Sequence, residues 1–285
     1  MQTKIVGVIG AGTMGNGIAQ VMAAAGLDVV LNDINEAAVD KGMAAIGASL
    51  KRLVSREKMT EAASTETLQR VNATTRLDDL APCDLVVEAA TENMQLKLKI
   101  FADLDRIARP EAILASNTSS ISLTRIAAAT KRPAQVIGMH FFNPVPVMQL
   151  VEVIRALQTS DATYDAIKAL TELIGKTPVE VRNSPGFVAN RILLPMLNEA
   201  VFCLQERLAS AEDIDQVMKL GMAHPIGPLA LADLIGLDTC LAILEVLYEG
   251  FKDPKYRPCP LWREKVEAGE LGRKSGRGFF DYARK

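Results

Sequence analysis

The sequence predicts an α/β fold in which a Rossmann-type, mostly parallel sheet domain is followed by an all-helical C-terminal domain. In the first part of the chain, short apolar runs alternate with helical patterns. A glycine-rich stretch directly follows the first apolar run, and no convincing strand pattern occurs between Pro185 and Phe279. Alternating strands and helices form strand–helix–strand units and hence a parallel sheet, whereas the later helical patterns indicate a second domain.

The predicted strands are short apolar runs with helical segments between most of them. In order, they cover residues 4–9, 28–32, 85–88, 113–116, 136–139, 150–153 and 177–182. The pattern changes at Asn183-Ser184-Pro185-Gly186, a combination typical of turns and linkers. We therefore predict a sheet domain over 1–184 and a helical domain over 185–285. In the second domain, helices are expected over 187–206, 211–222 and 229–249.

Composition excludes several classes of protein. Of the 285 residues, 49% are hydrophobic and 23% charged, as in globular proteins rather than disordered or collagen-like ones. The 32 basic and 34 acidic residues give a net charge of -2, which argues against a general nucleic-acid or membrane-surface binder. No run approaches the ~18 apolar residues that cross a membrane.

Cysteine spacing and the first residues bear on metal binding and location. The cysteines lack zinc-ligand spacing, so we expect reduced thiols and no metal site. The apolar run after Lys4 imitates part of a signal peptide, but its glycines and the polar residues Thr13, Asn16 and Gln20 argue against secretion. We therefore expect a cytoplasmic protein. The four cysteines are Cys83, Cys203, Cys240 and Cys259.

The stretch Gly10-Ala11-Gly12-Thr13-Met14-Gly15 matches the G-x-G-x-x-G motif, between a predicted strand and a helical segment. In this motif the first glycine permits a tight turn, the second lets a pyrophosphate approach the backbone, and the third lets helix and strand pack closely. The N-terminus of the helix adds N–H groups and a partial positive charge. All six residues are therefore candidate contacts of a dinucleotide cofactor.

Asp33 closes the second predicted strand, 18 residues after Gly15. A carboxylate at this place accepts hydrogen bonds from an adenosine ribose and repels a 2'-phosphate, which favours NAD over NADP. The structural alternative is a capping box, because Asp33 and Glu36 have the spacing that caps a following helix. Because the glycine motif precedes it, we favour NAD binding.

His140 follows the predicted strand 136–139 and is one of two histidines in the chain. At the carboxyl end of a parallel strand it would face the cofactor. A neutral imidazole can take the proton of a hydroxyl group while a hydride leaves the same carbon, and a carboxylate on its other nitrogen fixes the tautomer. Glu152, on the next predicted strand, is the candidate carboxylate. The other histidine, His224, lies in a proline-rich connection and is expected to be structural.

These residues belong to a series of motifs that resembles the L-3-hydroxyacyl-CoA dehydrogenase family, most closely its bacterial 3-hydroxybutyryl-CoA dehydrogenases. The resemblance extends over nearly the whole chain. Its motifs are the glycine motif with Asp33, DLVVEA at 84–89 with Glu92 and Lys97, SNTSS at 116–120, the segment 140–152, SPGFVANR at 184–191, HPIGP at 224–228, and GRKSG at 272–276 before GFF at 278–280.

The resemblance implies an NAD-dependent enzyme with an acyl-CoA substrate, in which His140 is the acid/base and Glu152 its partner. It also implies a homodimer formed through the C-terminal domain, which would bind substrate. Ser119 and Asn190 would hydrogen-bond substrate oxygens, although both side chains also suit turns and caps. The further NAD contacts that the resemblance implies are Glu92, Lys97, Ser119, Asn143 and Lys274. For Asn143 the alternative is again a turn, and for the two lysines it is plain solvation.

The segment 51–58 carries four positive charges and one negative charge. It is either a solvated helix face or a local site for the phosphates of coenzyme A, which the balanced total charge allows. The resemblance places coenzyme A contacts near Ser49 and Arg56. Lys51 and Arg52 are further candidates for this contact.

The leading prediction is an (S)-3-hydroxyacyl-CoA dehydrogenase that interconverts 3-hydroxybutyryl-CoA and acetoacetyl-CoA. One alternative keeps the base and the cofactor but acts on a free sugar acid, as the related gulonate dehydrogenases do. Another is a non-catalytic protein on the same fold, as in lens crystallins. The basic segment favours the thioester, and the joint presence of His140, Glu152, Ser119 and Asn190 favours catalysis. Because Asn190 and His140 lie in different predicted domains, we also expect the domains to close about the 183–186 link.

Overall fold

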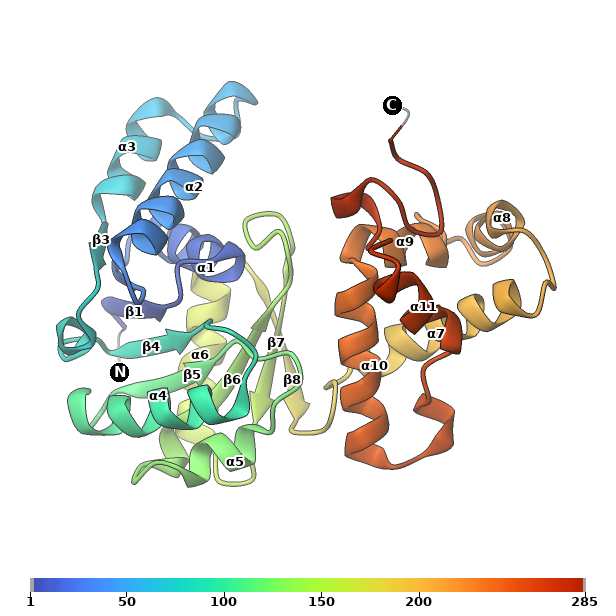
Figure 1. Ribbon diagram of the computed structural model, residues 1–285. Coiled ribbons are helices and arrows are strands. Elements are labelled where there is room, and N and C mark those ends of the chain that lie inside the picture. The colour runs from blue at the N-terminus through green and yellow to red at the C-terminus, as the bar shows by residue number, and fades with distance from the viewer. Residues whose placement is uncertain (1–2, 284–285) are drawn as a thin grey trace. The chain divides into compact units, whose positions relative to one another are not determined.

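The computed structural model describes residues 3–283, and packing divides the chain into two compact units, Met1–Ser184 and Pro185–Lys285 (Figure 1). Unit 1 and unit 2, as we call them, each contain their own hydrophobic core and are described separately. None of the helices in the described part of the chain combines the length and the apolar character needed to cross a membrane.

Unit 1 is built on one eight-stranded sheet with the order β3-β2-β1-β4-β5-β6-β7-β8. All neighbouring strands are parallel except β6 and β7, which are antiparallel. The predicted Rossmann-type, mostly parallel sheet is therefore confirmed. The strands are β1 (Ile5–Ile9), β2 (Asp28–Asn32), β3 (Val71–Thr74), β4 (Leu85–Glu88), β5 (Ile113–Ser116), β6 (Val136–Phe141), β7 (Leu150–Arg155) and β8 (Thr177–Arg182).

The strand predictions were wrong at three places, since β7 also continues past the predicted 150–153 to Arg155. Strand β3 was not predicted, because Val71 is its only fully buried residue and the other three carry small or polar side chains. Strand β6 is longer than predicted, since its antiparallel pairing with β7 continues to Phe141. His140 therefore lies within a strand rather than after one.

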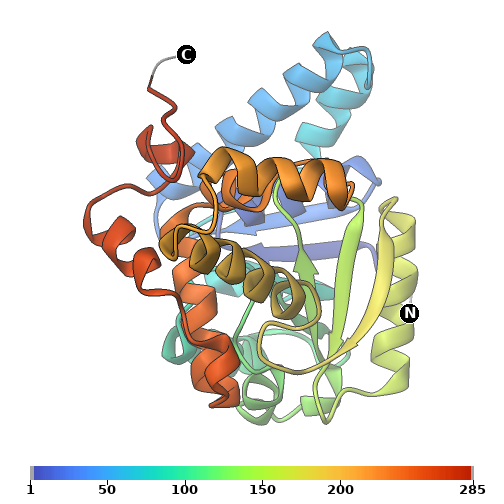
Figure 2. The same cartoon turned by 90° about the vertical axis from the view of Figure 1, so that its right-hand side faces the viewer.

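Helices cover both faces of the sheet of unit 1 (Figures 1 and 2). Helices α1, α2 and α6 contribute to the core on one face, whereas α4 and α5 lie on the opposite face. Helices α2 and α3 pack against each other and extend beyond the sheet. The helices are α1 (Thr13–Ala24), α2 (Glu36–Ser55), α3 (Glu61–Gln69), α4 (Met94–Ile107), α5 (Leu123–Ala128) and α6 (Asp161–Leu173), with short 3-10 turns η1 (Leu77–Leu80) and η2 (Pro133–Gln135).

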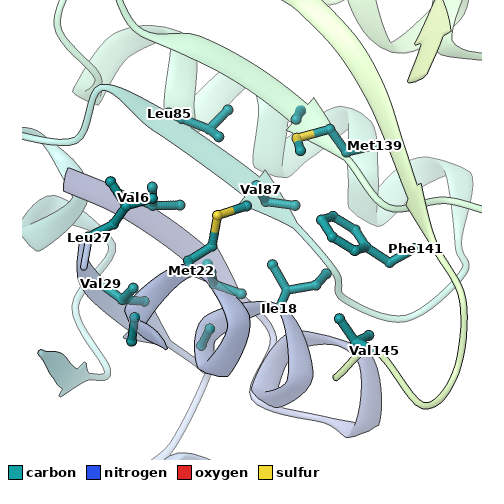
Figure 3. Packing of buried hydrophobic residues seen from close by; sticks show 14 of the residues in the cluster. Val6, Ile18, Met22, Leu27, Val29, Leu85, Val87, Met139, Phe141 and Val145 are labelled. Atoms are coloured by element: carbon teal, nitrogen blue, oxygen red, sulfur yellow. The ribbon is translucent and has the colours of Figure 1, made fainter. Parts of the chain in front are cut away.

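In the core of unit 1, buried side chains of α1 pack against those of the parallel strands (Figure 3). Ile18 and Met22 of α1 are fully buried and lie near Val87, Met139 and Phe141 in the close view. Burying a side chain of this size stabilises a fold by roughly 1.5–3 kcal/mol. The burial of these side chains therefore fixes α1, and with it the glycine turn at its N-terminus, against the sheet.

Unit 2 is helical, with its largest buried side chain, Trp262, in its core. The Trp262 indole and the Cys259 N–H both donate to the Asn198 side-chain oxygen. The single helix predicted over 229–249 was wrong, because Gly236, at φ +106°, separates two helices. The elements are α7 (Ala189–Gln205), α8 (Ala211–Gly221), α9 (Pro228–Ile235), α10 (Leu237–Phe251), η3 (Pro254–Tyr256), α11 (Pro260–Glu267) and η4 (Arg273–Ser275).

Candidate functional site

The glycine motif forms the turn between β1 and α1 and leaves space beside the start of the helix. Gly12 is the N-cap of α1, and a Cβ added to it would meet no atom within 4 Å. A Cβ added to Gly15 would overlap the carbonyl oxygen of Gly10, so the close packing of helix and turn requires glycine there. Because an N-cap without a side chain cannot itself satisfy the first N–H groups, this geometry fits the pyrophosphate of a dinucleotide.

Asp33 follows β2 and is hydrogen-bonded to the glycine turn. Its Oδ2 accepts from the N–H of Ala11 at 2.7 Å, and its Oδ1 accepts from the N–H of Ile34 at 2.7 Å. The capping-box alternative is wrong, because Asn35 is the N-cap of α2 and its side chain accepts from the N–H of Ala38. The Asp33 carboxylate is thus oriented at the end of β2, where ribose hydroxyls could donate to it.

A cavity of about 460 Å³ adjoins this turn and includes Gly10, Gly12 and Asp33 in its lining. Ile34, which is 89% exposed, also lines it and offers an apolar surface to a flat base. Ile34 could have been found from its position beside Asp33. Four further lining residues come from α4 and carry no local sequence signal, because only the tertiary fold brings that helix to the turn. They are Leu96, Lys99, Ile100 and Asp103.

His140 and Glu152 form a buried pair across β6 and β7. They lie directly opposite each other in the antiparallel ladder, and His140 Nδ1 is 2.7 Å from Glu152 Oε2. The two residues are only 5% and 2% exposed. A carboxylate can only accept, so Nδ1 carries the shared proton, and the basic lone pair of the neutral imidazole is on Nε2. The arrangement can therefore accept and return one proton.

Lys97 is buried rather than solvated. It is only 1% exposed, and its Nζ lies 2.6 Å from Glu88 Oε1 and 3.4 Å from Glu92 Oε2. The second oxygen of Glu88 accepts from the Ser116 hydroxyl at 2.6 Å. Glu88 and Ser116 stood within the predicted motifs, but no role was assigned to them. Their side chains connect the end of β4 to the end of β5.

Glu92 holds the segment that contains Ser119. Its Oε1 accepts from the Thr118 hydroxyl at 2.5 Å and from the N–H groups of Ser119 and Ser120 at 3.0 and 3.1 Å. Burial raises the pKa of Glu92, but the charge of Lys97 and these hydrogen bonds outweigh burial and leave the pKa below its ordinary value. The ionised carboxylate is thus the form that organises this segment.

The segment of Ser119 is also joined to the strand of His140. Asn117 accepts a hydrogen bond from the N–H of Phe141 at 2.9 Å through its Oδ1. Asn143, two residues farther on, is exposed and precedes a cis peptide bond to Pro144. The fold therefore brings the Ser119 segment to the segment that contains His140 and Asn143 at one edge of the sheet, although these two segments come from separate parts of the sequence.

The basic segment ends α2. Lys51, Arg52, Arg56 and Lys58 are all exposed, and Ser49 is half-buried on the same helix. Within residues 3–283, none of the four cations forms an ion pair at 4 Å or less. Exposed, unpaired cations are compatible with both alternatives, a solvated face and a phosphate site.

The remaining predicted residues belong to unit 2. Asn190 is half-buried in the first turn of α7, and His224 is half-buried in the connection after α8. Lys274 is not simply solvated, because its Nζ lies 2.5 Å and 2.7 Å from the two carboxylate oxygens of Asp238. No group of three or more His, Cys, Asp or Glu side chains in the described residues is placed to hold a metal ion.

Comparison with known proteins covers both units. The family model "3-hydroxyacyl-CoA dehydrogenase, NAD binding domain" matches residues 5–184, and "3-hydroxyacyl-CoA dehydrogenase, C-terminal domain" matches residues 186–282. A 3-hydroxybutyryl-CoA dehydrogenase of Bradyrhizobium diazoefficiens is 57% identical over 98% of this chain and 95% of its own. A probable 3-hydroxybutyryl-CoA dehydrogenase of Bacillus subtilis is 55% identical over 100% of this chain and 99% of its own. The crystal structure of (S)-3-hydroxybutyryl-CoA dehydrogenase from Ralstonia eutropha, 60% identical, matches with a TM-score of 0.95 over 99% of both chains.

Proposed function

The chain belongs to the 3-hydroxyacyl-CoA dehydrogenase family, and from this premise we propose that it interconverts (S)-3-hydroxybutyryl-CoA and acetoacetyl-CoA. Family membership makes it an NAD-dependent oxidoreductase, as the resemblance implied. The choice of the short acyl chain is supported by the names of relatives that are 55% and 57% identical. The observation that carries the proposed chemistry is the buried hydrogen bond between His140 and Glu152.

In the oxidative direction, His140 Nε2 takes the proton of the substrate hydroxyl group. Oxidised NAD, held by the residues around the glycine turn, would supply the hydride acceptor for the carbon that bears this group, which would become a ketone. The imidazole becomes positively charged as it takes the proton, and the Glu152 carboxylate on Nδ1 stabilises that charge. In reduction His140 returns the proton to the carbonyl oxygen. Ser119 and Asn190 are proposed to orient the substrate oxygens.

The residues proposed to hold NAD surround the glycine turn and the Ser119 segment. Residues 10–15 bind the pyrophosphate, and Asp33 accepts from the adenosine ribose. Glu92 and Lys97 act at the Ser119 segment, where their contacts described above support a role in shaping the site. Asn143 and Lys274 complete the proposed set.

Coenzyme A is proposed to bind the exposed end of α2. Ser49, Lys51, Arg52 and Arg56 would contact its phosphates, since the cations there carry no ion pair within the described chain. A negatively charged nucleotide gains most from cations that are not already neutralised. A site of this kind would distinguish an acyl-CoA enzyme from one that acts on a free sugar acid, which has no nucleotide.

We also propose a homodimer formed through unit 2 and a cytoplasmic location. The apolar residues Leu194, Leu197 and Val201 of α7 do not support a dimer, because they are buried within the core of unit 2. The support comes from α8, where Val217 and Leu220 are 62% and 82% exposed. Exposed apolar side chains one turn apart are typical of an interaction face.

The proposed reaction is tested by following NADH oxidation with acetoacetyl-CoA, with free acetoacetate and with a sugar acid. Rapid oxidation with acetoacetyl-CoA alone is expected. A preference for the free acids would favour the sugar-acid alternative, and no oxidation with any substrate would favour the non-catalytic one. Replacement of acetoacetyl-CoA by thioesters of longer 3-oxo acids would then define the acyl chain that the site prefers.

A further inference from the structure

Lys176 is a buried lysine whose ammonium group, within the described residues, is hydrogen-bonded only to backbone carbonyls. It lies between α6 and β8 and is 8% exposed. Its Nζ donates to the carbonyl oxygens of Val145 and Met148, both at 2.7 Å. Within residues 3–283, no carboxylate lies within 4 Å of this Nζ. Burial lowers the pKa of Lys176. Burying a cation costs free energy, so the charged ammonium group needs its two well-formed hydrogen bonds to remain buried.

The backbone of Lys176 is held by the end of α6. The Gly175 N–H donates to the carbonyl of Glu172 and the Lys176 N–H donates to that of Thr171, both at 3.0 Å. With Gly175 at φ +74°, this is the Schellman arrangement that ends a helix. The next residue, Thr177, pairs with the carbonyl of Gln149 at 2.8 Å. The base of the Lys176 side chain is therefore fixed, and the side chain can hold another segment in place.

The segment that Lys176 holds, residues 142–149, joins β6 to β7. Its turn is closed by the N–H groups of Val147 and Met148, which both donate to the carbonyl of Pro144. On its other side the segment rests on α1, because Val145 is 2% exposed and a Cβ added to Gly17 would lie 2.8 Å from the Val145 Cβ. The segment thus lies between α1, on one side, and the Lys176 ammonium group, on the other.

We propose that Lys176 is a positioning residue for the NAD site. Its ammonium group draws the Val145 and Met148 carbonyls together and keeps the 142–149 segment seated on α1. Asn143 belongs to this segment, so its place relative to the glycine turn depends on these contacts. The inference rests on the proposed function through the role of Asn143 as a cofactor contact. Lys176 itself touches neither substrate nor cofactor in this scheme.

The test compares Lys176→Met, which keeps the bulk of the side chain but removes its donors, with the matched control Lys168→Met. Lys168 is an exposed lysine of α6. Two quantities are measured on the whole protein: amide hydrogen exchange without ligand, and NADH affinity by fluorescence. In Lys176→Met we expect faster exchange at Val147 and Met148 with unchanged exchange at Ile46 in the core. We also expect roughly ten-fold weaker NADH binding, the effect of about one lost hydrogen bond to a charged group.

Kinetics separate positioning from general loss of structure. We expect the KM for NADH to rise in Lys176→Met while kcat changes less, and the control to behave as wild type. If Lys176→Met does not fold, Lys176→Gln replaces it, since a neutral amide still has two donors but no charge. Wild-type exchange at residues 147 and 148 together with wild-type NADH affinity would overturn the proposal. Uniformly faster exchange with unchanged NADH affinity would also overturn it. A wild-type protein that binds NADH but does not reduce acetoacetyl-CoA would instead contradict the proposed function and leave the positioning role of Lys176 intact.

Discussion

At the scale of single residues, His140 carries the proposed proton transfer. Replacing it as His140→Gln should lower turnover by at least ~100-fold, because general acid–base catalysis is typically worth 10²–10⁴-fold. NADH should still bind, since the glycine turn follows β1 and Asp33 follows β2, whereas His140 belongs to β6. Turnover with acetoacetyl-CoA and NADH affinity are the measurements. His224→Gln serves as the matched control and should keep full activity. Normal turnover in His140→Gln would remove this residue from the mechanism.

Asp33 has two linked tasks, because its carboxylate is proposed to accept from the adenosine ribose and also accepts from the N–H of Ala11. Asp33→Ala should weaken NAD binding by roughly ten-fold or more, the effect of losing hydrogen bonds to a charged group. It should also narrow the difference between NAD and NADP, since the repulsion of a 2'-phosphate is lost. Affinities for both cofactors measure this, with Glu36→Ala as a control. A wild-type protein that uses NADPH as well as NADH would contradict the assignment.

Glu92 should make the stability of the protein depend on acidic pH. Its pKa in the folded protein lies below the ordinary 4.5, because Lys97 and the hydrogen bonds from residues 118–120 outweigh burial. A lowered pKa means that the stabilisation is present above pH 4.5 and disappears as the pH falls through the folded value. We therefore expect Glu92→Gln to be less stable than wild type at neutral pH, with the difference shrinking below pH 4.5. Urea unfolding between neutral and acidic pH measures it, and a difference independent of pH would contradict this account.

At the scale of elements, the exposed end of α2 is predicted to bind the nucleotide part of coenzyme A. Reversing Arg56 or Lys51 to Glu should raise the KM for acetoacetyl-CoA, more at low salt than at high salt, because surface charges are screened within about 10 Å at 0.1 M salt. A truncated thioester without the nucleotide should be affected little. Lys41→Glu, an exposed change earlier on the same helix, is the control. Equal effects on both substrates would mean that the segment is only a solvated helix face.

At the scale of the whole molecule, the proposed site needs residues from both units, so ligands should bring the units closer. In the structure, the link about which the units would close is shorter than the predicted 183–186 segment. Asn183 accepts from the N–H of Leu123 in unit 1 at 2.9 Å, whereas Gly186 and Phe187 are buried in unit 2. Gly186 is closely packed, because a Cβ there would lie 2.6 Å from the Leu247 side chain. Pro185 also packs within unit 2, because a Cβ added to Gly250 would lie 2.7 Å from the Pro185 Cγ.

We predict that NAD and substrate together shorten the distance between the centres of the two units. Solution scattering with and without both ligands measures the change through the radius of gyration. NAD alone and substrate alone are the controls. Neither is expected to change the radius of gyration as both do together, because closure should require ligand contacts with both units. An unchanged radius of gyration with both ligands would mean that the site is preformed.

Local sequence patterns determined the strand–turn–helix unit at the start of the chain and most of the sheet. Apolar runs at 28–32, 85–88 and 113–116 coincide with β2, β4 and β5, because a strand buried on both faces needs a continuous apolar run. The glycine motif could also be recognised from the sequence, because the residues that form the turn are six neighbours in the chain. Local pattern did not reveal β3, whose pairing with β2 is made by backbone with little apolar burial.

Only the tertiary structure decided how the distant residues of the site meet. The register of β6 on β7 sets His140 opposite Glu152, and no spacing rule predicts that register. The burial of Lys97 and Lys176 was equally hidden, because a lysine is solvated unless the fold brings acceptors to it. The sequence by itself therefore determined which chemistry the protein has at hand, since that depends on residue type and local order. The structure decided orientation, burial and charge pairing, because these depend on strand register and on contacts between residues far apart in the chain.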